Sequence, residues 1–218
     1  MVRIRDLVPK FIFNKLWGER RRWGRKPDET DPHWLEWQEK QYEFYQENQR
    51  KGIGSMVNDS GYSVMAEIDL REKCVLEVGP GDMRHHRFWN SRPEKYIIAD
   101  IHEDMMNAAV NVFRKDKINF ESYLIKRNEK LALAKDSVDV IVSFYSLEHL
   151  YPLANYLEDM KYYLKPNGII VGAIPAEGGL LWALGRFFTS RRWLYKNTNI
   201  DYDKLICWEH PNYADFII

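Results

Sequence analysis

The sequence predicts an α/β protein with a doubly wound, Rossmann-like sheet that is mainly parallel and carries helices on both faces. Short, nearly continuous apolar segments recur between residues 73 and 174, and stretches with helical spacing separate them. Strands that are apolar on both faces need covering on both faces, and right-handed crossovers between them give a parallel sheet. The predicted strands are 74–79, 95–100, 119–125, 137–145 and 168–174, and the predicted helices between them include 103–115 and 152–164.

Charge is balanced overall but unevenly distributed. The 218 residues include 32 Lys and Arg against 32 Asp and Glu, and 45% of the residues are hydrophobic. This composition argues against a disordered chain and against a uniformly basic nucleic-acid binder. Residues 1–26 nevertheless hold nine basic and two acidic residues, a net charge of +7, so the remainder has a net charge of −7.

The segments outside the predicted sheet fall into three parts. Residues 1–30 are predicted to form a basic, amphipathic arm and a linker, and residues 31–70 a helical extension or lid. In that extension, Asp31 followed by Pro32 is typical of a helix start, with a helix expected over 32–50 and a shorter one over 55–67. Residues 71–175 form the predicted sheet domain. Residues 176–218 are predicted to be an aromatic lid with an incomplete C-terminal part.

Several site classes find no support. The two cysteines, Cys74 and Cys207, exclude a disulfide scaffold and a CxxC metal site, so we expect no metal. No signal peptide and no run of 18 apolar residues is present, so we expect a cytoplasmic protein without a membrane span.

The ends of the first two predicted strands carry the residues with the clearest chemical meaning. Strand 74–79 runs into Gly79-Pro80-Gly81, where glycines let the backbone turn tightly, and a helix is expected next whose N-terminal amides face an anionic group. The second strand ends at Asp100, whose carboxylate suits the two hydroxyls of a ribose. A dinucleotide site would need a third glycine where Arg84 stands, and Glu77 would repel a pyrophosphate. The pattern therefore favours S-adenosylmethionine, which has an ammonium group, over a nicotinamide dinucleotide.

These motifs resemble the class I S-adenosylmethionine-dependent methyltransferases of the type 11 kind. VLEVGPGD, IIADIHEDMM and the stretch from SVDVIVSFY to LKPNGIIVGAIP resemble, in order, the family's first motif, its second strand and its fourth and fifth strands. The resemblance implies the family's fold, S-adenosylmethionine as cofactor and methyl transfer as activity. The family's sheet ends in a strand hairpin, and too few residues follow 174 for one, so we expect that hairpin to be missing or incomplete.

Residue by residue, the resemblance implies the following roles. Glu77 would bind the methionine amino group, and Gly79, Pro80 and Gly81 would pass under the methionine portion. Asp100 would hold the ribose, Ile101 would lie against the adenine, and Phe144 would border the sulfonium. Two departures stand out. Met83 replaces the third glycine of the motif, and the acid that binds the adenine amino group is missing, with Asn128 near its place.

The sequence identifies the acceptor of the methyl group less clearly than the cofactor. Glu148-His149 resembles the pair found in some O-methyltransferases, and His149 has a suitable pKa for a general base, although a structural role is also open. We expect a small-molecule, glycan or lipid-linked acceptor and favour an oxygen atom. Nucleic acid is not expected, because no [DN]PP[YF] motif follows the fourth strand. A methyltransferase-like binding module without catalysis, and an NAD-dependent oxidoreductase, remain the alternatives.

Two apolar and basic segments, 7–26 and 180–196, suggest peripheral contact with the inner membrane face.

Overall fold

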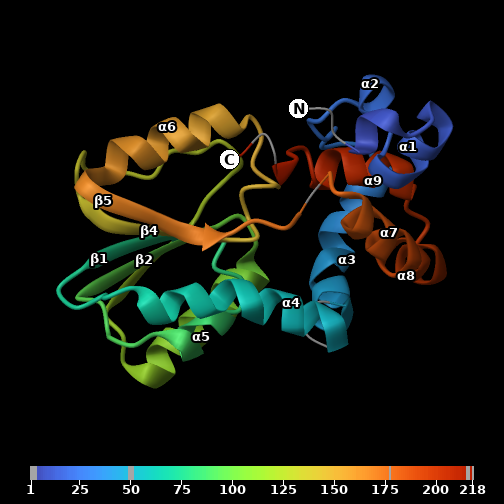
Figure 1. The fold of residues 1–218 in the computed structure, drawn as a ribbon. Coiled ribbons are helices and arrows are strands. Elements are labelled where there is room, and N and C mark those ends of the chain that lie inside the picture. Colours follow the sequence, from blue (N-terminus) through green and yellow to red (C-terminus); the bar gives the residue numbers. More distant parts are fainter. Residues whose placement is uncertain (1–3, 49–51, 177, 215–216, 218) are drawn as a thin grey trace. The chain divides into compact units, whose positions relative to one another are not determined.

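The computed structural model describes residues 4–48, 52–176, 178–214 and 217 (Figure 1). The chain divides into two compact units. One comprises residues 1–54, 147–151 and 174–218 and is helical; the other comprises residues 55–146 and 152–173 and holds the sheet. The four segments that we delimited from the sequence remain a prediction.

The sheet unit has five parallel strands in the order β3-β2-β1-β4-β5. The chain moves outward from the centre through β1, β2 and β3, then returns to the other side of β1 for β4 and β5, so the order reverses between β1 and β4. This doubly wound, Rossmann-like arrangement confirms the predicted fold class. The bounds are β1 (Cys74–Val78), β2 (Lys95–Asp100), β3 (Phe120–Leu124), β4 (Val138–Phe144) and β5 (Leu164–Ala173).

Helices cover both faces of this sheet, as predicted (Figure 1). On one face, Phe113 and Met106 pack among apolar side chains of β1, β2 and β4, such as Val75 and Ile98. Among the residues that the structure describes, one helix covers the opposite face and presents Met160 toward it. The elements on the first face are α4 (Gly52–Tyr62), η2 (Ser63–Glu67), η3 (Arg84–Phe88) and α5 (Glu103–Asp116); the helix on the second is α6 (Leu153–Tyr163).

The helix predicted directly after the first strand does not form, which corrects that expectation. In its place, η3 is a five-residue 3-10 turn. Met83 precedes it in the left-handed conformation, with φ 58°, and Trp89 ends it in an extended conformation. Pro93 follows and disfavours a helical conformation for the residue before it. The turn after β1 therefore lacks the N-terminal amides of a full helix.

The fifth strand begins earlier than predicted because it contains an irregularity. Val138 pairs with Leu164 and Val140 pairs with Ile169, so four residues of β5 lie opposite Asp139 alone. Lys165 donates from Nζ to Asp139 at 2.9 Å within this bulge. Pairing becomes regular only from Ile169 onward, which is the part that the apolar pattern identifies.

The helical unit contains the remaining elements. Its predicted helix start is confirmed: α3 begins at Pro32, and Asp31 accepts a hydrogen bond from the backbone N–H of His33 at 3.0 Å. Residues 49–50 of that predicted helix lie outside the described residues. The elements are η1 (Ile4–Leu7), α1 (Lys10–Trp17), α2 (Arg20–Trp23), α3 (Pro32–Asn48), α7 (Leu180–Phe188), α8 (Ser190–Asn197) and α9 (Tyr202–Glu209).

The aromatic residues of this unit are mainly its core. Trp34 and Trp37 of α3 are buried with Trp208 of α9, and the ring of Phe44 packs edge-on against that of Trp193, with centroids 5.2 Å apart. The basic N-terminal segment takes part as well, because Leu16 and Trp17 of α1 are buried beside Ala183 of α7. Between α7 and residue 214 the described residues contain no strand.

None of the helices in the described part of the chain combines the length and the apolar character that crossing a membrane requires.

Candidate functional site

The tight turn after β1 contacts β2 on one side and the residues just beyond β4 on the other. Gly79 adopts φ 73° and Gly81 φ 54°, both in the region that favours glycine. The backbone N–H of Gly79 donates to the carbonyl oxygen of Ala99 in β2 at 2.9 Å, which continues the sheet register into the turn. Ser146, just beyond β4, donates from its hydroxyl to the carbonyl oxygen of Val78 at 2.9 Å. Pro80 lies between the glycines, at the rim of the carboxyl edge of the sheet.

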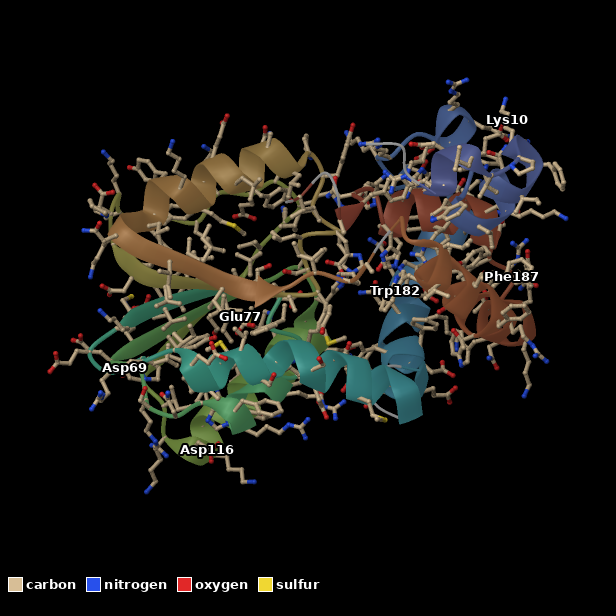
Figure 2. The ribbon with its side chains drawn as sticks, in the orientation of Figure 1. Lys10, Asp69, Glu77, Asp116, Trp182 and Phe187 are labelled. Carbon is tan, nitrogen blue, oxygen red and sulfur yellow. The ribbon has the colours of Figure 1, made fainter. Side chains whose placement is uncertain are left out.

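Glu77 is fully buried in the layer between the sheet and the α4 side (Figure 2). Tyr96 donates from its hydroxyl to Glu77 Oε2 at 2.8 Å, and His85 Nε2 lies 3.1 Å from the same oxygen. Glu77 Oε1 lies 3.0 Å from His85 Nε2, but it accepts no hydrogen bond from any described residue. The buried carboxyl group therefore has two neutral donors around one oxygen and spare acceptor capacity on the other.

The tautomer of His85 follows from its second neighbour. The indole Nε1 of Trp89 can only donate, and it donates to His85 Nδ1 at 3.1 Å. His85 Nδ1 therefore carries no proton, and the ring proton sits on Nε2, where it points to Glu77. The His85 ring, 1% exposed, stacks on the ring of Phe144 with centroids 5.0 Å apart.

Asp100 ends β2 as a second buried carboxylate. It is 7% exposed, and its Oδ1 accepts a hydrogen bond from the backbone N–H of His102 at 2.8 Å. Burial, with a smaller contribution from the charge of Glu77, raises the pKa of Asp100 to about 6, against the lowering effect of its backbone hydrogen bonds. Ile101, the next residue, is 40% exposed at the same strand end.

The end of β4 is closed by aromatic rings. Phe144 is 6% exposed and lies edge-on to Tyr62, with ring centroids 5.1 Å apart. Tyr145 follows with φ 53°, an uncommon conformation for a residue with a side chain, and its hydroxyl donates to the carbonyl oxygen of Asn58 at 3.3 Å. Phe144 is therefore packed in the core, on the same face of the sheet as Glu77.

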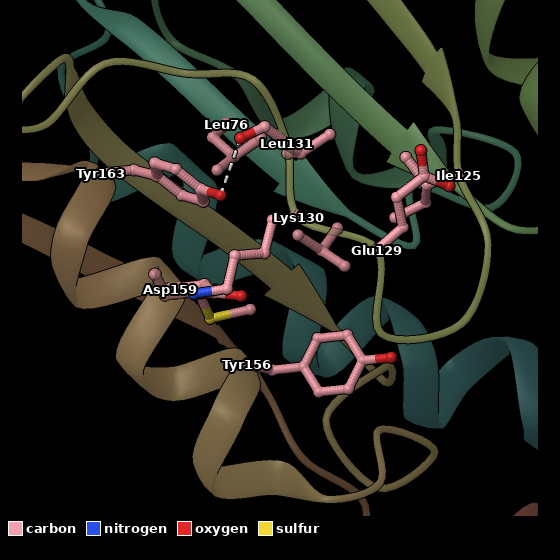
Figure 3. Close-up of a pocket in the computed structure, with 10 residues that line it drawn as sticks. Leu76, Ile125, Glu129, Lys130, Leu131, Tyr156, Asp159 and Tyr163 are labelled. Atoms are coloured by element: carbon pink, nitrogen blue, oxygen red, sulfur yellow. Dashed lines mark hydrogen bonds and ion pairs between the residues drawn. The ribbon is translucent and has the colours of Figure 1, made fainter.

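Asn128 lies in the loop after β3, beside a cavity on the α6 face of the sheet. Its backbone N–H donates to the hydroxyl of Tyr156 at 2.9 Å, and its side chain is exposed. Tyr156 lines the cavity, together with Leu76, Val78 and Ile125 (Figure 3). A hydrogen bond from Tyr163 to the carbonyl oxygen of Leu131 closes one side.

His149 belongs to the helical unit. Its Nδ1 donates to the carbonyl oxygen of Glu209 at 2.5 Å, and its Nε2 lies 3.7 Å from Glu148 Oε1. Asn212 supports this segment by donating to the carbonyl oxygens of Leu147 and Leu150 at 2.9 and 2.6 Å.

Most of the predicted cofactor-binding residues thus share the carboxyl edge of β1, β2 and β4, namely Glu77, Gly79, Pro80, Gly81, Asp100, Ile101 and Phe144. Asn128, in contrast, lies beyond β3. Sequence reasoning missed His85 and Tyr96, which contact Glu77, and Trp89, which donates to His85. Tyr96 has the same parity along β2 as Ile98 and Asp100, so strand alternation alone places it on their face. For His85 and Trp89, which lie on a short turn, no such periodic signal exists. Across the described ranges, no group of three or more His, Cys, Asp or Glu residues is arranged to hold a metal ion.

Residues 76–172 match the family model described as a methyltransferase domain. A comparison with curated proteins finds no match. Among solved structures, a SAM-dependent methyltransferase from Aquifex aeolicus is 26% identical, with 47% of this chain and 57% of that chain covered and a TM-score of 0.40. An S-adenosylmethionine-dependent methyltransferase from Mesorhizobium loti is 18% identical, with 54% and 55% covered and a TM-score of 0.42. The YcgJ protein from Bacillus subtilis is 19% identical, with 53% and 48% covered and a TM-score of 0.39. The chain thus spans about half the length of these proteins.

Proposed function

We propose that residues 76–172, which match the family model of a methyltransferase domain, form a class I domain that binds S-adenosylmethionine and transfers its methyl group to an acceptor. The observation that carries the proposal is the pair of buried carboxylates, Glu77 and Asp100, on either side of the Gly79 turn. A ligand with an ammonium group and a vicinal diol matches both.

The two buried carboxyl groups, of Glu77 and Asp100, fit this cofactor. Glu77 Oε1 is buried without a hydrogen bond from the described residues, so it has capacity for a cation. Asp100 Oδ1 accepts one backbone hydrogen bond, and its carboxylate retains acceptor sites for ribose hydroxyls. A nicotinamide dinucleotide would bring a pyrophosphate toward the buried Glu77, and the short η3 turn offers no helix N-terminus to receive it. This disfavours the oxidoreductase alternative.

The residues that would hold the cofactor are proposed in the same roles as above. Glu77 would receive the ammonium group, Gly79, Pro80 and Gly81 would pass under the methionine portion, and Asp100 would bind the ribose. Ile101 is exposed beside Asp100, which supports a contact with the adenine. Phe144 at the sulfonium has the least support, because its ring is packed on His85.

Asn128 is proposed to contact the adenine amino group in place of the missing acid. Its exposed side chain supports this role, since the amide oxygen is a suitable acceptor.

We propose His149 as the general base for a hydroxyl acceptor. S-adenosylmethionine supplies an activated methyl group on a sulfonium, so the protein has to orient the acceptor, exclude water and remove its proton. The Nδ1–H of His149 is held by the carbonyl oxygen of Glu209, and its Nε2 lies 3.7 Å from Glu148 Oε1. This supports an oxygen atom of a small-molecule, glycan or lipid-linked acceptor as the methylated position.

Calorimetry with S-adenosylhomocysteine and with NAD tests the cofactor. We expect the wild-type chain to bind the first and not the second. Asp100→Asn should weaken binding by about tenfold, because it removes charge-assisted hydrogen bonds, whereas Asp104→Asn, on the exposed first turn of α5, should leave it unchanged. Binding of NAD alone, or equal binding by both variants, would contradict the proposal.

A binding module without catalysis is distinguished by product formation. A panel of phenolic, sugar and lipid-linked hydroxyl acceptors with labelled cofactor should yield a methylated product with the wild-type chain. His149→Gln should lower kcat with little change in KM if Nε2 takes the proton. Cofactor binding without product from any of the acceptors would favour the module.

Peripheral contact with an anionic membrane surface is proposed for the helical unit. Phe11 of α1 and Leu181 and Phe188 of α7 are exposed, at 69%, 85% and 60%, within segments that are rich in Lys and Arg. Deletion of residues 1–26 would remove Leu16 and Trp17 from the core, so substitution is the better test.

Flotation with vesicles that contain anionic lipid checks this contact. The variant Phe11→Ser with Leu181→Ser should lose recovery in the vesicle fraction. Leu124→Ser, which removes an exposed apolar side chain from the end of β3, is the control and should float as the wild type does. A wild-type chain that stays in the soluble fraction would contradict membrane contact.

A further inference from the structure

The His85 ring is the buried group that the proposed reaction leaves unused. It lies at the centre of a chain of hydrogen bonds from Trp89 through His85 to Glu77, with Tyr96 as the second donor to Glu77. His85, Glu77 and Tyr96 are each at most 1% exposed. The chain of contacts lies within the sheet unit and ends on the carboxyl group proposed to receive the cofactor.

The direction of each hydrogen bond in this series is fixed. Trp89 can only donate, so His85 Nδ1 must accept and His85 Nε2 must donate. Because Nδ1 accepts the indole N–H, the hydrogen bond to Glu77 comes from Nε2. Stacking on Phe144, with rings inclined by 30°, fixes the ring plane. His85 Nε2 also lies 3.0 Å from Glu77 Oε1, so the ring faces both oxygens of the carboxyl group.

A buried carboxylate of this kind is costly until a cation reaches it. We infer that His85 is a positioning residue: held by Trp89, it donates from Nε2 to Glu77 and orients that carboxyl group for the α-ammonium group of the cofactor. This inference rests on the proposed function. It goes further by assigning to Trp89 and His85 the preference for ligands that carry an amino-acid tail over nucleosides that lack one.

Two ligands separate positioning from general structural support. S-adenosylhomocysteine and 5′-methylthioadenosine share the adenosine and the sulfur atom, but only the first has the ammonium group. His85→Phe keeps an aromatic ring and removes the donor. We expect it to weaken S-adenosylhomocysteine by about tenfold, since a hydrogen bond to a charged group is lost, and to leave 5′-methylthioadenosine unchanged. His85→Gln, which can still donate, should restore part of the difference.

The neighbouring histidine provides a matched control. His86 is half-buried, packs edge-on against Trp89 and faces Asp116, and it makes no contact with Glu77 among the described residues. His86→Gln should change neither affinity. Trp89→Phe leaves His85 in place and frees its Nδ1, so a selective loss of about threefold for S-adenosylhomocysteine is expected. If thermal unfolding shows that His85→Phe is not folded, Trp89→Phe is used for the test instead.

Nitrogen-15 NMR of the wild-type chain reads the tautomer without any ligand. The expected result is a His85 ring protonated at Nε2 only, and a ring protonated at Nδ1 would overturn the inference. Equal weakening of both ligands by His85→Phe, or no weakening of either, would also overturn it. If the wild-type chain binds neither ligand, the proposed function fails. The tautomer measurement then still decides whether His85 donates from Nε2 to Glu77.

Discussion

Gly79 and Ser146 meet where the ends of β1 and β4 approach each other: a Cβ atom built on Gly79 would lie 2.9 Å from the Cβ of Ser146. Ser146 is fixed there by Ser143, with the two hydroxyl oxygens 2.7 Å apart, and by the carbonyl oxygen of Val78. Because Gly79 also has φ 73°, this position requires glycine both for its conformation and for its space.

Gly79→Ala should lower the free energy of unfolding by about 2–4 kcal/mol, from the left-handed conformation together with the contact. Chemical denaturation measures this change. Gly79→Ala in a Ser146→Gly background is the control, because the Cβ that the new methyl group would meet is then absent. The excess loss in the background that keeps Ser146 is the cost of the contact. Equal losses in the two backgrounds would show that the contact is harmless.

Asp100→Asn should stabilise the ligand-free protein above pH 6. The pKa of Asp100 is raised to about 6 from an ordinary 3.8, so between about pH 4 and pH 6 the folded state binds more protons than the unfolded state. The free energy of unfolding therefore falls as the pH rises through this window, and the loss persists above it. Asparagine has no such loss, and we expect about 2–3 kcal/mol of relative stabilisation at pH 8 that disappears below pH 4.

Urea unfolding at a series of pH values checks this expectation, with Asp104→Asn as the exposed control. A stabilisation by Asp100→Asn that is the same at pH 4 and pH 8 would show that the carboxylate does not titrate in this window. Affinity for S-adenosylhomocysteine should rise over the same window in the wild type, because the ionised carboxylate is the better acceptor for the ribose hydroxyls.

Tyr96→Phe should destabilise the sheet unit and weaken S-adenosylhomocysteine. Burial, followed by the proximity of Glu77, raises the pKa of Tyr96 well above its usual value, so the hydroxyl stays protonated as a donor. Its loss leaves Glu77 Oε2 with one donor, at a cost of about 1–3 kcal/mol. Tyr163→Phe, which removes a bond to a neutral carbonyl oxygen at 3.0 Å, should cost less. Denaturation of both variants gives the comparison, and the prediction fails if Tyr163→Phe is the more damaging.

Asn212→Ala should loosen the segment that carries His149. The Asn212 side chain is the donor to two carbonyl oxygens of residues 147–151, and it is buried. We expect a loss of about 1–3 kcal/mol and faster hydrogen exchange at the amides of residues 147–151. Asn119→Ala, which removes one exposed bond to the carbonyl oxygen of Glu94, is the control. Unchanged exchange in the Asn212 variant would show that the segment is held by other contacts.

The strand pattern could be predicted because it depends on local chemistry. Runs such as 74–78 and 138–144 are apolar at nearly every position, which only a strand covered on both faces requires. The helix predicted after the first strand was wrong, because the conformation of Met83 depends on how the turn packs rather than on its own preference. Likewise, the bulge in β5 arises from pairing with Asp139, a partner that is distant in the sequence.

By itself, the sequence determined the fold class, the order of the motifs and the positions of Glu77 and Asp100, because alternation and turn residues act over a few neighbours. Only the tertiary structure decided what surrounds those carboxylates. Tyr96 comes from β2, whereas His85 and Trp89 lie on the turn after β1, and a hydrogen-bond direction follows only once a donor and an acceptor are brought together. The burial that raises the pKa of Asp100 is in the same way a property of the packed sheet unit, since desolvation depends on every atom that excludes water from the carboxylate.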